Sequence, residues 1–426
     1  MHHKFFVISL VWAAVLASGQ FATQPVTLKS FDLDFASFAN DGVLSVSRGP
    51  ERTVIRPSLL QATNMEAGAG SIIIEFDCTA ADNSLCPKAK AAYQNVANTL
   101  AKILNLRVDI RVQAQFYSLC PLCNDNTLGQ ALPTRFFNVK GIAGVDENYL
   151  YPSSLARQLS NSITSKDTDI QIQFNADNPS AFVSKGYNRF WFQGDATIKK
   201  DQYDFEYVVL HEMIHGLGAM TSLGMYLPEN NLLPDFKGLT FRLNMTRSRD
   251  GKAVTMQEVL PPLIFDKFLY TVNGDPLAKV YGDLFNTSQP KPLEDWIADF
   301  KKSPAFSVSQ QLYQQSTSAK GLKFQIPNSD ESILLHTSYT PFRPGSSLSH
   351  FDQITYSNME EFLMRPEAQS GIVLADLSNG RFPIGPKTVK LLRAMGYDTN
   401  IPSSSHPTRI ATSAFSLIFV SALLYI

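Results

Sequence analysis

Two histidines and a glutamate stand at a spacing that suits metal chemistry. His211 and His215 are four residues apart in the stretch FEYVVLHEMIHGLG, and Glu212 directly follows the first of them. On an α-helix such a pair projects from one face about one turn apart, so both imidazoles can reach one zinc ion at ~2.0–2.1 Å. Glu212 is too close in angle to be a third ligand with this pair. It can instead hold a metal-bound water and accept its proton as a general base.

The flanking residues predict the helix that this spacing requires. Asp204 is suited to the N-cap, and Gly218 to a left-handed position after the last turn. The opposite face is apolar and would dock the helix on a sheet. Its residues are Val209, Leu210, Met213 and Leu217.

The motif is specific. With 7 histidines in 426 residues, an H-E-x-x-H match arises by chance in roughly half a per cent of chains of this length. Two alternatives stay open at this point. One is a pair of exposed helix histidines that bind no metal, and the other is a protein that binds zinc without turning over a substrate.

A catalytic zinc needs a third protein ligand and an open fourth position for water. Three histidines lie near the ends of the chain and are set aside: His2, His3 and His406. His350 lies in the turn-rich stretch PGSSLSHFD, which can bend a side chain into a cleft, and is the favoured third ligand. His336, in SILLHTSY, fits a strand or a partly buried histidine better. A carboxylate, Asp352 or Glu361, is a further alternative.

The residues before the motif predict a small α/β unit. Strands are expected at SIIIEFD from Ser71 and at two stretches where apolar and polar residues alternate, DIRVQAQF and DIQIQF. A helix is expected from Pro87 to Asn105, and a short one at 152–159 within the connection 128–160. The remainder of the chain is rich in loops. No repeat of fixed period is present, so a solenoid or propeller is not expected.

Composition narrows the classes of function. Lys and Arg number 37 against 38 Asp and Glu, a net charge of −1, which gives no electrostatic footprint for nucleic acid. With 44% hydrophobic and 11% aromatic residues, the chain can bury a sizeable core and is not a disordered protein.

Both ends resemble sorting signals. The first stretch, MHHKFFVISLVWAAVLASGQ, is typical of a signal peptide of residues 1–19, cleaved before Gln20. The last stretch, SSSHPTRIATSAFSLIFVSALLYI, has small residues, a polar spacer and an apolar tail, the three parts of a signal for a glycosylphosphatidylinositol (GPI) anchor. Ser403 is the favoured attachment residue, and a C-terminal amphipathic or core segment is the alternative.

The expected secretory compartment decides how the cysteines are interpreted. In an oxidising environment they favour two disulfides over a redox or zinc site, with the pairing left open. The four are Cys78, Cys86, Cys120 and Cys123. Glycosylation fits the same compartment, since Asn244 and Asn286 are acceptor positions. No cysteine lies in residues 20–65, so latency through a thiolate on the metal is not expected.

The run from His211 to Gly218 resembles the first part of the metzincin zinc signature. The match departs at Thr221, where most metzincins carry the third histidine. Leishmanolysin-like metzincins place that histidine after a long insertion, and this chain is similar to that arrangement, with His350 in the third position. Further similarity to secreted bacterial and fungal HExxH proteins covers residues 70 to 398. It is carried by the phrases LGQALP, LPPLIFDKFL, YTPFRPGSSLSHFD, EEFLM and LLRAMGYDT.

The resemblance implies an α+β fold, a metzincin-like catalytic domain with a mixed sheet, an active-site helix and an irregular C-terminal subdomain. It implies Met364 as the methionine turn beneath the metal, and Asp352 and Tyr356 as supporting groups, although core or turn positions explain these residues equally well. The expected organisation is a signal peptide (1–19), a cover or propeptide (20–65), an upper catalytic subdomain (66–218), an insertion (219–345), a lower catalytic subdomain (346–400) and an anchor signal (401–426).

Together these observations predict a secreted zinc endopeptidase, monomeric and held at the extracellular face of the membrane by a lipid anchor. Zinc would polarise the scissile carbonyl of a peptide or protein substrate, and Glu212 would pass the water proton to the leaving amine. The alternative is an inactive surface binding or adhesion protein on a metalloprotease scaffold, against which the intact Glu212 counts. A serine hydrolase is not expected, because the chain has no G-x-S-x-G elbow.

Overall fold

The structure is a computed structural model, and it describes residues 25–34, 45–48, 52–55, 70–119, 128–164, 166–177, 185–224, 243–247, 254–277, 290–357 and 360–400. Several predicted features lie outside these residues: the signal peptide, the anchor signal with Ser403, the acceptor Asn286, and both Cys120 and Cys123. In the part of the chain that is described, no helix is both long and apolar enough to span a membrane.

A four-stranded sheet forms the base of the site. Its order is β4 (Ile72–Cys78), β5 (Ile110–Tyr117), β9 (Ile170–Asn175) and β6 (Gly129–Pro133), of which only β6 is antiparallel to its neighbour. Alternate residues of β5 and β9 are fully buried on one face, as their alternating sequences predict. The two alternating strands predicted from the sequence are therefore confirmed, and β6 is the edge next to the site.

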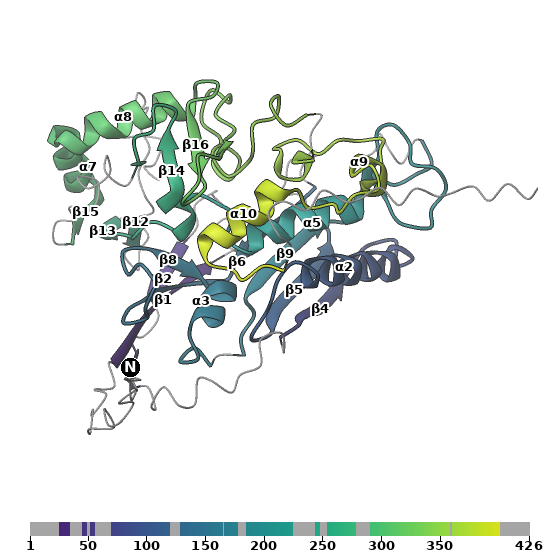
Figure 1. Ribbon diagram of the computed structural model, residues 1–426, viewed down its shortest axis with the longest axis horizontal. Coiled ribbons are helices and arrows are strands. Elements are labelled where there is room, and N and C mark those ends of the chain that lie inside the picture. Colours follow the sequence, from purple (N-terminus) through teal and green to yellow (C-terminus); the bar gives the residue numbers. More distant parts are fainter. Residues whose placement is uncertain are drawn as a thin grey trace, which may run out of the picture.

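Two helices cover the buried face of this sheet (Figure 1). They are α2 (Leu85–Ala101) and α5 (Phe205–Gly216). Six aromatic rings interlock beneath them with centroids 5.0–6.5 Å apart, and Phe205 of α5 lies at their centre. The helix expected at 87–105 is present but ends earlier, because the Ile103 N–H bonds to the Leu100 carbonyl and Leu104 forms a bridge with Thr399.

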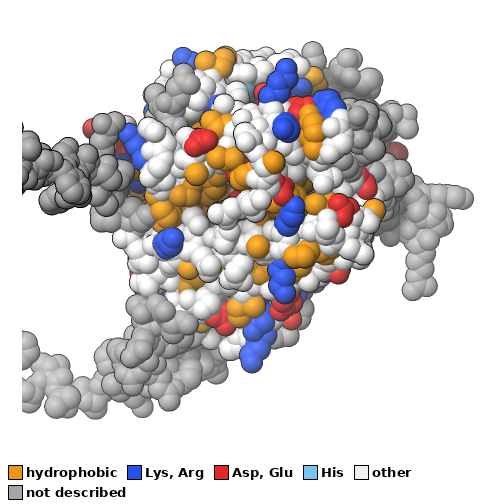
Figure 2. Space-filling model, turned by 90° about the vertical axis from the view of Figure 1, so that its right-hand side faces the viewer, with side chains coloured by type: hydrophobic (Ala, Val, Ile, Leu, Met, Phe, Trp, Pro, Cys, Tyr) orange, Lys and Arg blue, Asp and Glu red, His pale blue; other side chains and the backbone are white. Residues whose placement is uncertain are grey.

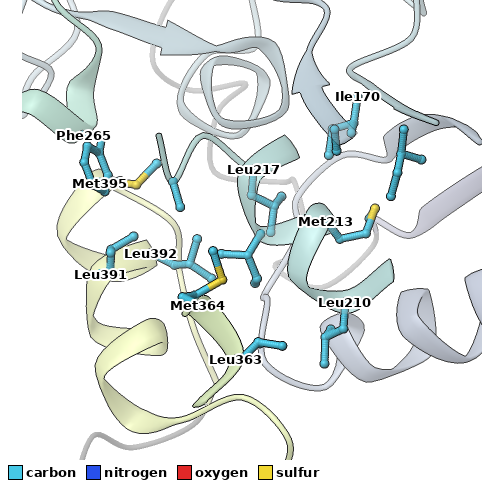
Figure 3. Close-up of a cluster of buried hydrophobic side chains, with 14 of the residues drawn as sticks. Ile170, Leu210, Met213, Leu217, Phe265, Leu363, Met364, Leu391, Leu392 and Met395 are labelled. Carbon is cyan, nitrogen blue, oxygen red and sulfur yellow. The ribbon is translucent and has the colours of Figure 1, made fainter. Parts of the chain in front are cut away.

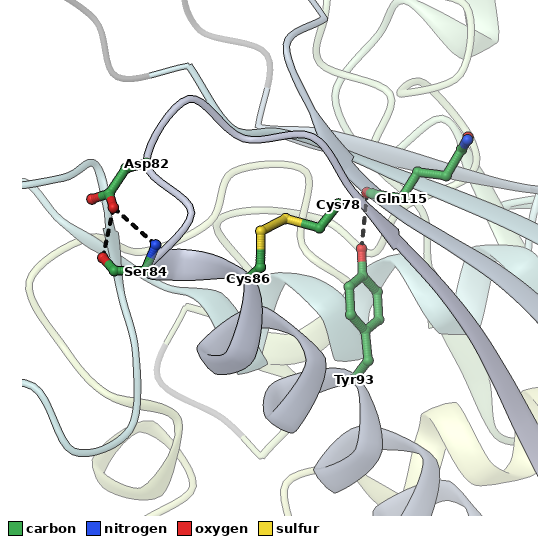
Figure 4. The surroundings of a disulfide bond; sticks show 6 residues. All are labelled: Cys78, Asp82, Ser84, Cys86, Tyr93 and Gln115. Carbon is green, nitrogen blue, oxygen red and sulfur yellow. Dashed lines mark hydrogen bonds between the residues drawn. A yellow bond between two sulfur atoms is a disulfide. The ribbon is translucent and has the colours of Figure 1, made fainter.

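A disulfide closes the connection between the first strand and this helix (Figure 4). Cys78 ends β4, Cys86 lies in the first turn of α2, and their Cα atoms are 5.9 Å apart. Between them, the Asp82 carboxylate accepts hydrogen bonds from the Ser84 N–H at 3.0 Å and hydroxyl at 2.6 Å. One of the two expected disulfides is thus present, and it fixes where α2 starts.

A second, antiparallel sheet joins the N-terminal segment to strands from the middle of the chain. The order is β2 (Ser45–Arg48), β1 (Pro25–Asp34), β7 (Arg135–Val139) and β8 (Leu150–Pro152), and β3 (Arg52–Ile55) also pairs with β1. The expected cover, residues 20–65, therefore contributes three strands to this sheet, of which β1 pairs with β7. The short helix predicted after β8 is confirmed as α3 (Ser153–Leu159).

The expected insertion, residues 219–345, forms small sheets and two helices at one end of the molecule, drawn in green in Figure 1. One three-stranded sheet consists of β12 (Leu243–Arg247), β13 (Val254–Val259) and β15 (Lys291–Pro292). The other consists of β14 (Leu269–Thr271), β16 (Leu322–Gln325) and β17 (Ser332–Leu334). The helical pieces are η2 (Ile264–Phe268), α7 (Leu293–Lys302) and α8 (Pro304–Ser316). The acceptor Asn244 lies on β12.

The C-terminal part packs back onto α5. Its elements are η4 (Phe362–Met364), α9 (Leu374–Leu377) and α10 (Pro386–Met395). On the other side of α5 in the chain, a short parallel pair of strands precedes the helix: β10 (Phe190–Trp191) and β11 (Tyr203–Asp204). Figure 3 shows Leu217 of α5 facing Met364 of η4 and Leu392 of α10, while Met213 of α5 points to the other side, toward Ile170 of β9. All five belong to one buried cluster. The fold is therefore α+β, as predicted, with its core centred on α5.

One face of the molecule shows how charge is distributed. In Figure 2, hydrophobic side chains gather in a band across the middle of the face, and Lys, Arg, Asp and Glu are scattered above and below it. The two signs of charge are interspersed on this face rather than gathered in separate patches, which matches the net charge of −1.

Candidate metal centre

Three histidine side chains converge at the end of α5. The Nε2 atoms of His211 and His215 are 3.2 Å apart, and each is 3.1 Å from the Nε2 atom of His350. His215 and His350 are buried, and His211 is half-buried. The structure therefore brings the two motif histidines together with the favoured distant one.

The other ring nitrogen of each histidine faces a backbone carbonyl. Nδ1 of His211 is 2.6 Å from the Leu363 oxygen, Nδ1 of His215 is 2.8 Å from the Ala219 oxygen, and Nδ1 of His350 is 2.8 Å from the Ser346 oxygen. Because a carbonyl can only accept, each Nδ1 carries the proton in the neutral ring. All three Nε2 atoms then present lone pairs to one another.

Burial keeps these rings neutral. It lowers the pKa of His211 to about 4 and that of His215 to about 3, and it lowers the pKa of His350 well below its ordinary value. Neutral imidazole is the form that binds a metal ion. Three facing lone pairs without a proton between them repel one another, and a cation at their centre converts this repulsion into attraction.

The spacing of the nitrogens fits such an ion. Ligand atoms bound at ~2.0–2.1 Å around a tetrahedral centre lie about 3.3 Å from one another, close to the 3.1 and 3.2 Å between these Nε2 atoms. In the described residues, these three side chains are the group of His, Cys, Asp and Glu whose ligand atoms meet closely enough to hold a metal ion. The structure thus contains a three-histidine group that could bind a metal.

The alternative ligands lie outside this group of three. Asp352 accepts a hydrogen bond from the Thr355 N–H at 2.8 Å, and Glu361 accepts one from the Lys387 N–H at 2.6 Å at the start of α10. His336 is buried with its ring 4.3 Å from that of Tyr339, centroid to centroid. Tyr356 holds β17, since its hydroxyl accepts from the Leu334 N–H at 3.0 Å.

Glu212 follows His211 on α5 and is partly buried. Desolvation raises the pKa of its carboxyl to about 8, and a hydrogen bond with the Ala131 backbone opposes this rise. Ala131 belongs to β6, the edge strand of the main sheet. The Glu212 carboxyl group therefore contacts that edge strand.

Helix α5 is fixed at both ends as its sequence predicts. The Asp204 carboxylate accepts from the N–H groups of Glu206 at 2.9 Å and Tyr207 at 3.3 Å, and its second oxygen accepts from the Leu374 N–H at 2.8 Å. Gly218 has a φ of +101°, and a Cβ atom there would lie 2.7 Å from Cγ of Pro152. Both the N-cap and the left-handed glycine are thus confirmed.

The segment around His350 is held by contacts distant in sequence. The N–H of His336 donates to the His350 carbonyl at 2.8 Å, and the N–H of Phe351 donates to the Met364 carbonyl at 2.7 Å. Met364 is buried and follows Leu363, whose carbonyl faces His211. The turn proposed for Met364 therefore touches the site through its backbone.

Sequence reasoning did not identify the groups that orient the rings. The carbonyls of Ala219, Ser346 and Leu363 carry no signal in side-chain type. Sequence reasoning also did not single out Asp266, a buried carboxylate in η2. The signal that could have found it is an aspartate within the apolar run PPLIFDKFL.

Comparisons with known proteins give a family but no activity. A family model described as SPBPB7E8-like matches residues 42–419. The chain is also similar to the uncharacterized protein PB7E8.01 of Schizosaccharomyces pombe, with 24% identity over 357 residues. The match covers 75% of this chain and 60% of that protein, so the chain spans about three fifths of the length of its relative. No solved structure matches the chain.

Proposed function

We propose a function for this chain, which belongs to the SPBPB7E8-like family, from the chemistry of its site: a zinc-dependent endopeptidase. The observation that carries the proposal is the meeting of three neutral imidazole nitrogens at 3.1–3.2 Å, with Glu212 following His211 on the same helix. Three nitrogen ligands and a neighbouring carboxylate are the parts that a hydrolytic zinc site needs.

Each residue then has a defined task. His211, His215 and His350 would hold the ion, which supplies a Lewis acid and a bound water of lowered pKa. In its ionised form, Glu212 would accept the proton of the attacking water and deliver it to the amine that leaves. Its partly open position lets water and substrate reach it, and its contact with Ala131 fixes its orientation.

The edge strand supports a peptide as the substrate. Along β6, the Leu128 carbonyl accepts from Asn175 and the Thr134 N–H donates to the Asp169 carbonyl, so even-numbered residues bond to β9. The backbone groups of Gly129 and of Ala131 then point to the open side of the sheet. An extended peptide can add to such an edge as a further strand, which would bring its backbone next to Glu212.

The proposed location rests on the two terminal stretches. A secreted protein held at the outer face of the membrane by a GPI anchor agrees with the disulfide between Cys78 and Cys86. A phospholipase that cuts such anchors should release the native protein from membranes, and truncation after Ser403 should give a freely secreted form. Retention after the cut would require another mode of attachment.

The decisive test combines metal analysis with proteolysis. The purified chain should contain one zinc per molecule and should digest an unstructured protein into peptides. A chelator should stop the digestion, and added zinc should restore it. A protein that holds zinc but leaves every tested polypeptide intact would favour a binding protein on this scaffold, and a protein without zinc would contradict the proposal.

A further inference from the structure

We propose that Asp266 is a positioning residue of the metal centre. Its carboxylate comes from the expected insertion and fixes the turn after α5, and this turn bonds to the segment that carries His350. This inference rests on the proposed zinc site, and it assigns part of the insertion a task within that site.

Asp266 is buried, with 2% of its surface exposed, and its carboxylate accepts hydrogen bonds only from neutral groups in this region. One oxygen accepts from the Thr221 hydroxyl at 2.6 Å. The other accepts from the N–H groups of Ser222 at 3.0 Å and Leu263 at 3.1 Å, and from the Ser222 hydroxyl. Four donors around one buried carboxylate hold the turn in a single arrangement.

This turn contacts the site at two places. At its start, the Ala219 carbonyl orients the ring of His215. At its middle, the Thr221 N–H donates to the hydroxyl of Ser349 at 3.2 Å, and Ser349 directly precedes His350. Asp266 thereby acts on one metal ligand from each motif, through groups that do not themselves reach the metal-binding nitrogens.

Thr221 connects Asp266 with the segment of His350. Its hydroxyl donates to Asp266, while its backbone N–H donates to the hydroxyl of Ser349. Thr221, Ser222 and Ser349 are all at least nine-tenths buried, so water does not replace these bonds easily. The contacts that hold the His350 segment to the turn therefore pass through Thr221.

The test measures the zinc affinity of the full chain by competition with a chromophoric chelator, and the absorption spectrum of the cobalt-substituted protein. Asp266→Asn keeps the shape but turns an amide N–H₂ toward groups that are themselves donors. Because partners that orient ligands typically contribute 10–100-fold to metal affinity, we expect zinc binding at least tenfold weaker and a changed cobalt spectrum. Ser349→Ala, which removes only the bridge, should weaken zinc binding by less.

Asp169→Asn is the matched control. Asp169 is also buried and accepts from Arg157 at 2.5 Å and from the Arg111 N–H at 2.9 Å, away from the turn and from His350. It should lower thermal stability while leaving zinc affinity within twofold of the original.

The outcomes separate the two proposals. If the unaltered chain binds zinc but Asp266→Asn and Ser349→Ala bind it equally well, or no worse than the Asp169 variant, the positioning role is wrong and the zinc site stands. Should Asp266→Asn fail to fold, unchanged zinc affinity in Ser349→Ala overturns the role alone. If the unaltered chain binds no zinc, both proposals fail.

Discussion

The helix motif, residues 204–218, and the distant segment, residues 346–364, meet at one site but are held differently. In the helix motif, Asp204 caps its own first turn and the two histidines face together because they are one turn apart. In the distant segment, His350 depends on the backbone of His336, of Met364 and of the turn at Ser346. A local pattern fixes the first half of the site, and tertiary contacts fix the second.

The largest effect should come from breaking the distant half. In His350→Ala we expect the protein to bind no zinc when the two are mixed in equal amounts, because one of the three protein ligands disappears. The loss of zinc affinity should exceed the roughly 10–100-fold that is typical when a residue supporting a ligand is removed. Metal content after gel filtration measures this. His336→Ala is the control and should keep its zinc with an ordinary loss of stability. Loss of zinc in the control alone would exchange the roles of the two histidines.

The next effect concerns the helix half. Glu212→Gln leaves all three nitrogens in place but removes the base, so zinc should stay bound while the turnover of a peptide falls by about 10²- to 10⁴-fold. Initial rates at saturating substrate, together with metal content, measure this. Full activity with zinc present would mean that another group accepts the proton.

In the distant segment, the contribution of Glu361 to stability should depend on pH. Burial raises the pKa of Glu361 to about 7, against the opposing effect of the N–H groups of Lys387 and Thr388. The folded state then holds the proton more tightly than the unfolded state, so stability falls as pH rises from the ordinary 4.5 to about 7, by about 3 kcal/mol.

Glu361→Gln should remove this part of the dependence. The free energy of unfolding in urea, measured for both proteins at pH 5 and pH 8, should favour the variant by about 2.5 kcal/mol more at the higher pH. An identical difference at the two pH values would show that the carboxyl titrates at its ordinary pKa in the folded protein.

Removing the N-cap of α5 tests whether contacts close in sequence are what hold the helix motif. Asp204→Ala leaves the N–H groups of Glu206 and Tyr207 without their acceptor, and also that of Leu374 in α9. We expect a loss of about 2 kcal/mol in unfolding free energy. Asp204→Ser, which can still cap, should recover part of it. A Ser variant no better than Ala would assign the loss mainly to the Leu374 contact.

The smallest effect is expected at the methionine. Met364 is buried, and its backbone rather than its sulfur contacts the site segment. Met364→Leu conserves volume and should cost less than about 1.5 kcal/mol, with zinc content unchanged. Thermal unfolding with and without zinc measures both. A marked loss of zinc would show that the side chain itself supports the site.

Features held by contacts close in sequence were predictable, and those held by contacts distant in sequence were not. The alternation in β5 and the stripe on α5 report burial directly, because each residue's neighbours are set by a short period. Gly218 was predictable since only a left-handed residue ends the helix there. The pairing of β1 with β7 and the hydrogen bonds of Asp266 join residues remote in the chain, and no local pattern encodes such contacts.

One late contact bears on how the protein is made. Tyr397, just after α10, donates from its hydroxyl to the carbonyl of Leu217 at 2.9 Å and lies 2.8 Å from the hydroxyl of Ser154 in α3. The end of α5 is thus completed by a residue synthesised long after it. A chain emerging from the ribosome has both motif histidines well before it has His350 or Tyr397. The three-histidine group therefore cannot assemble until the segment around His350 and Tyr397 has been made.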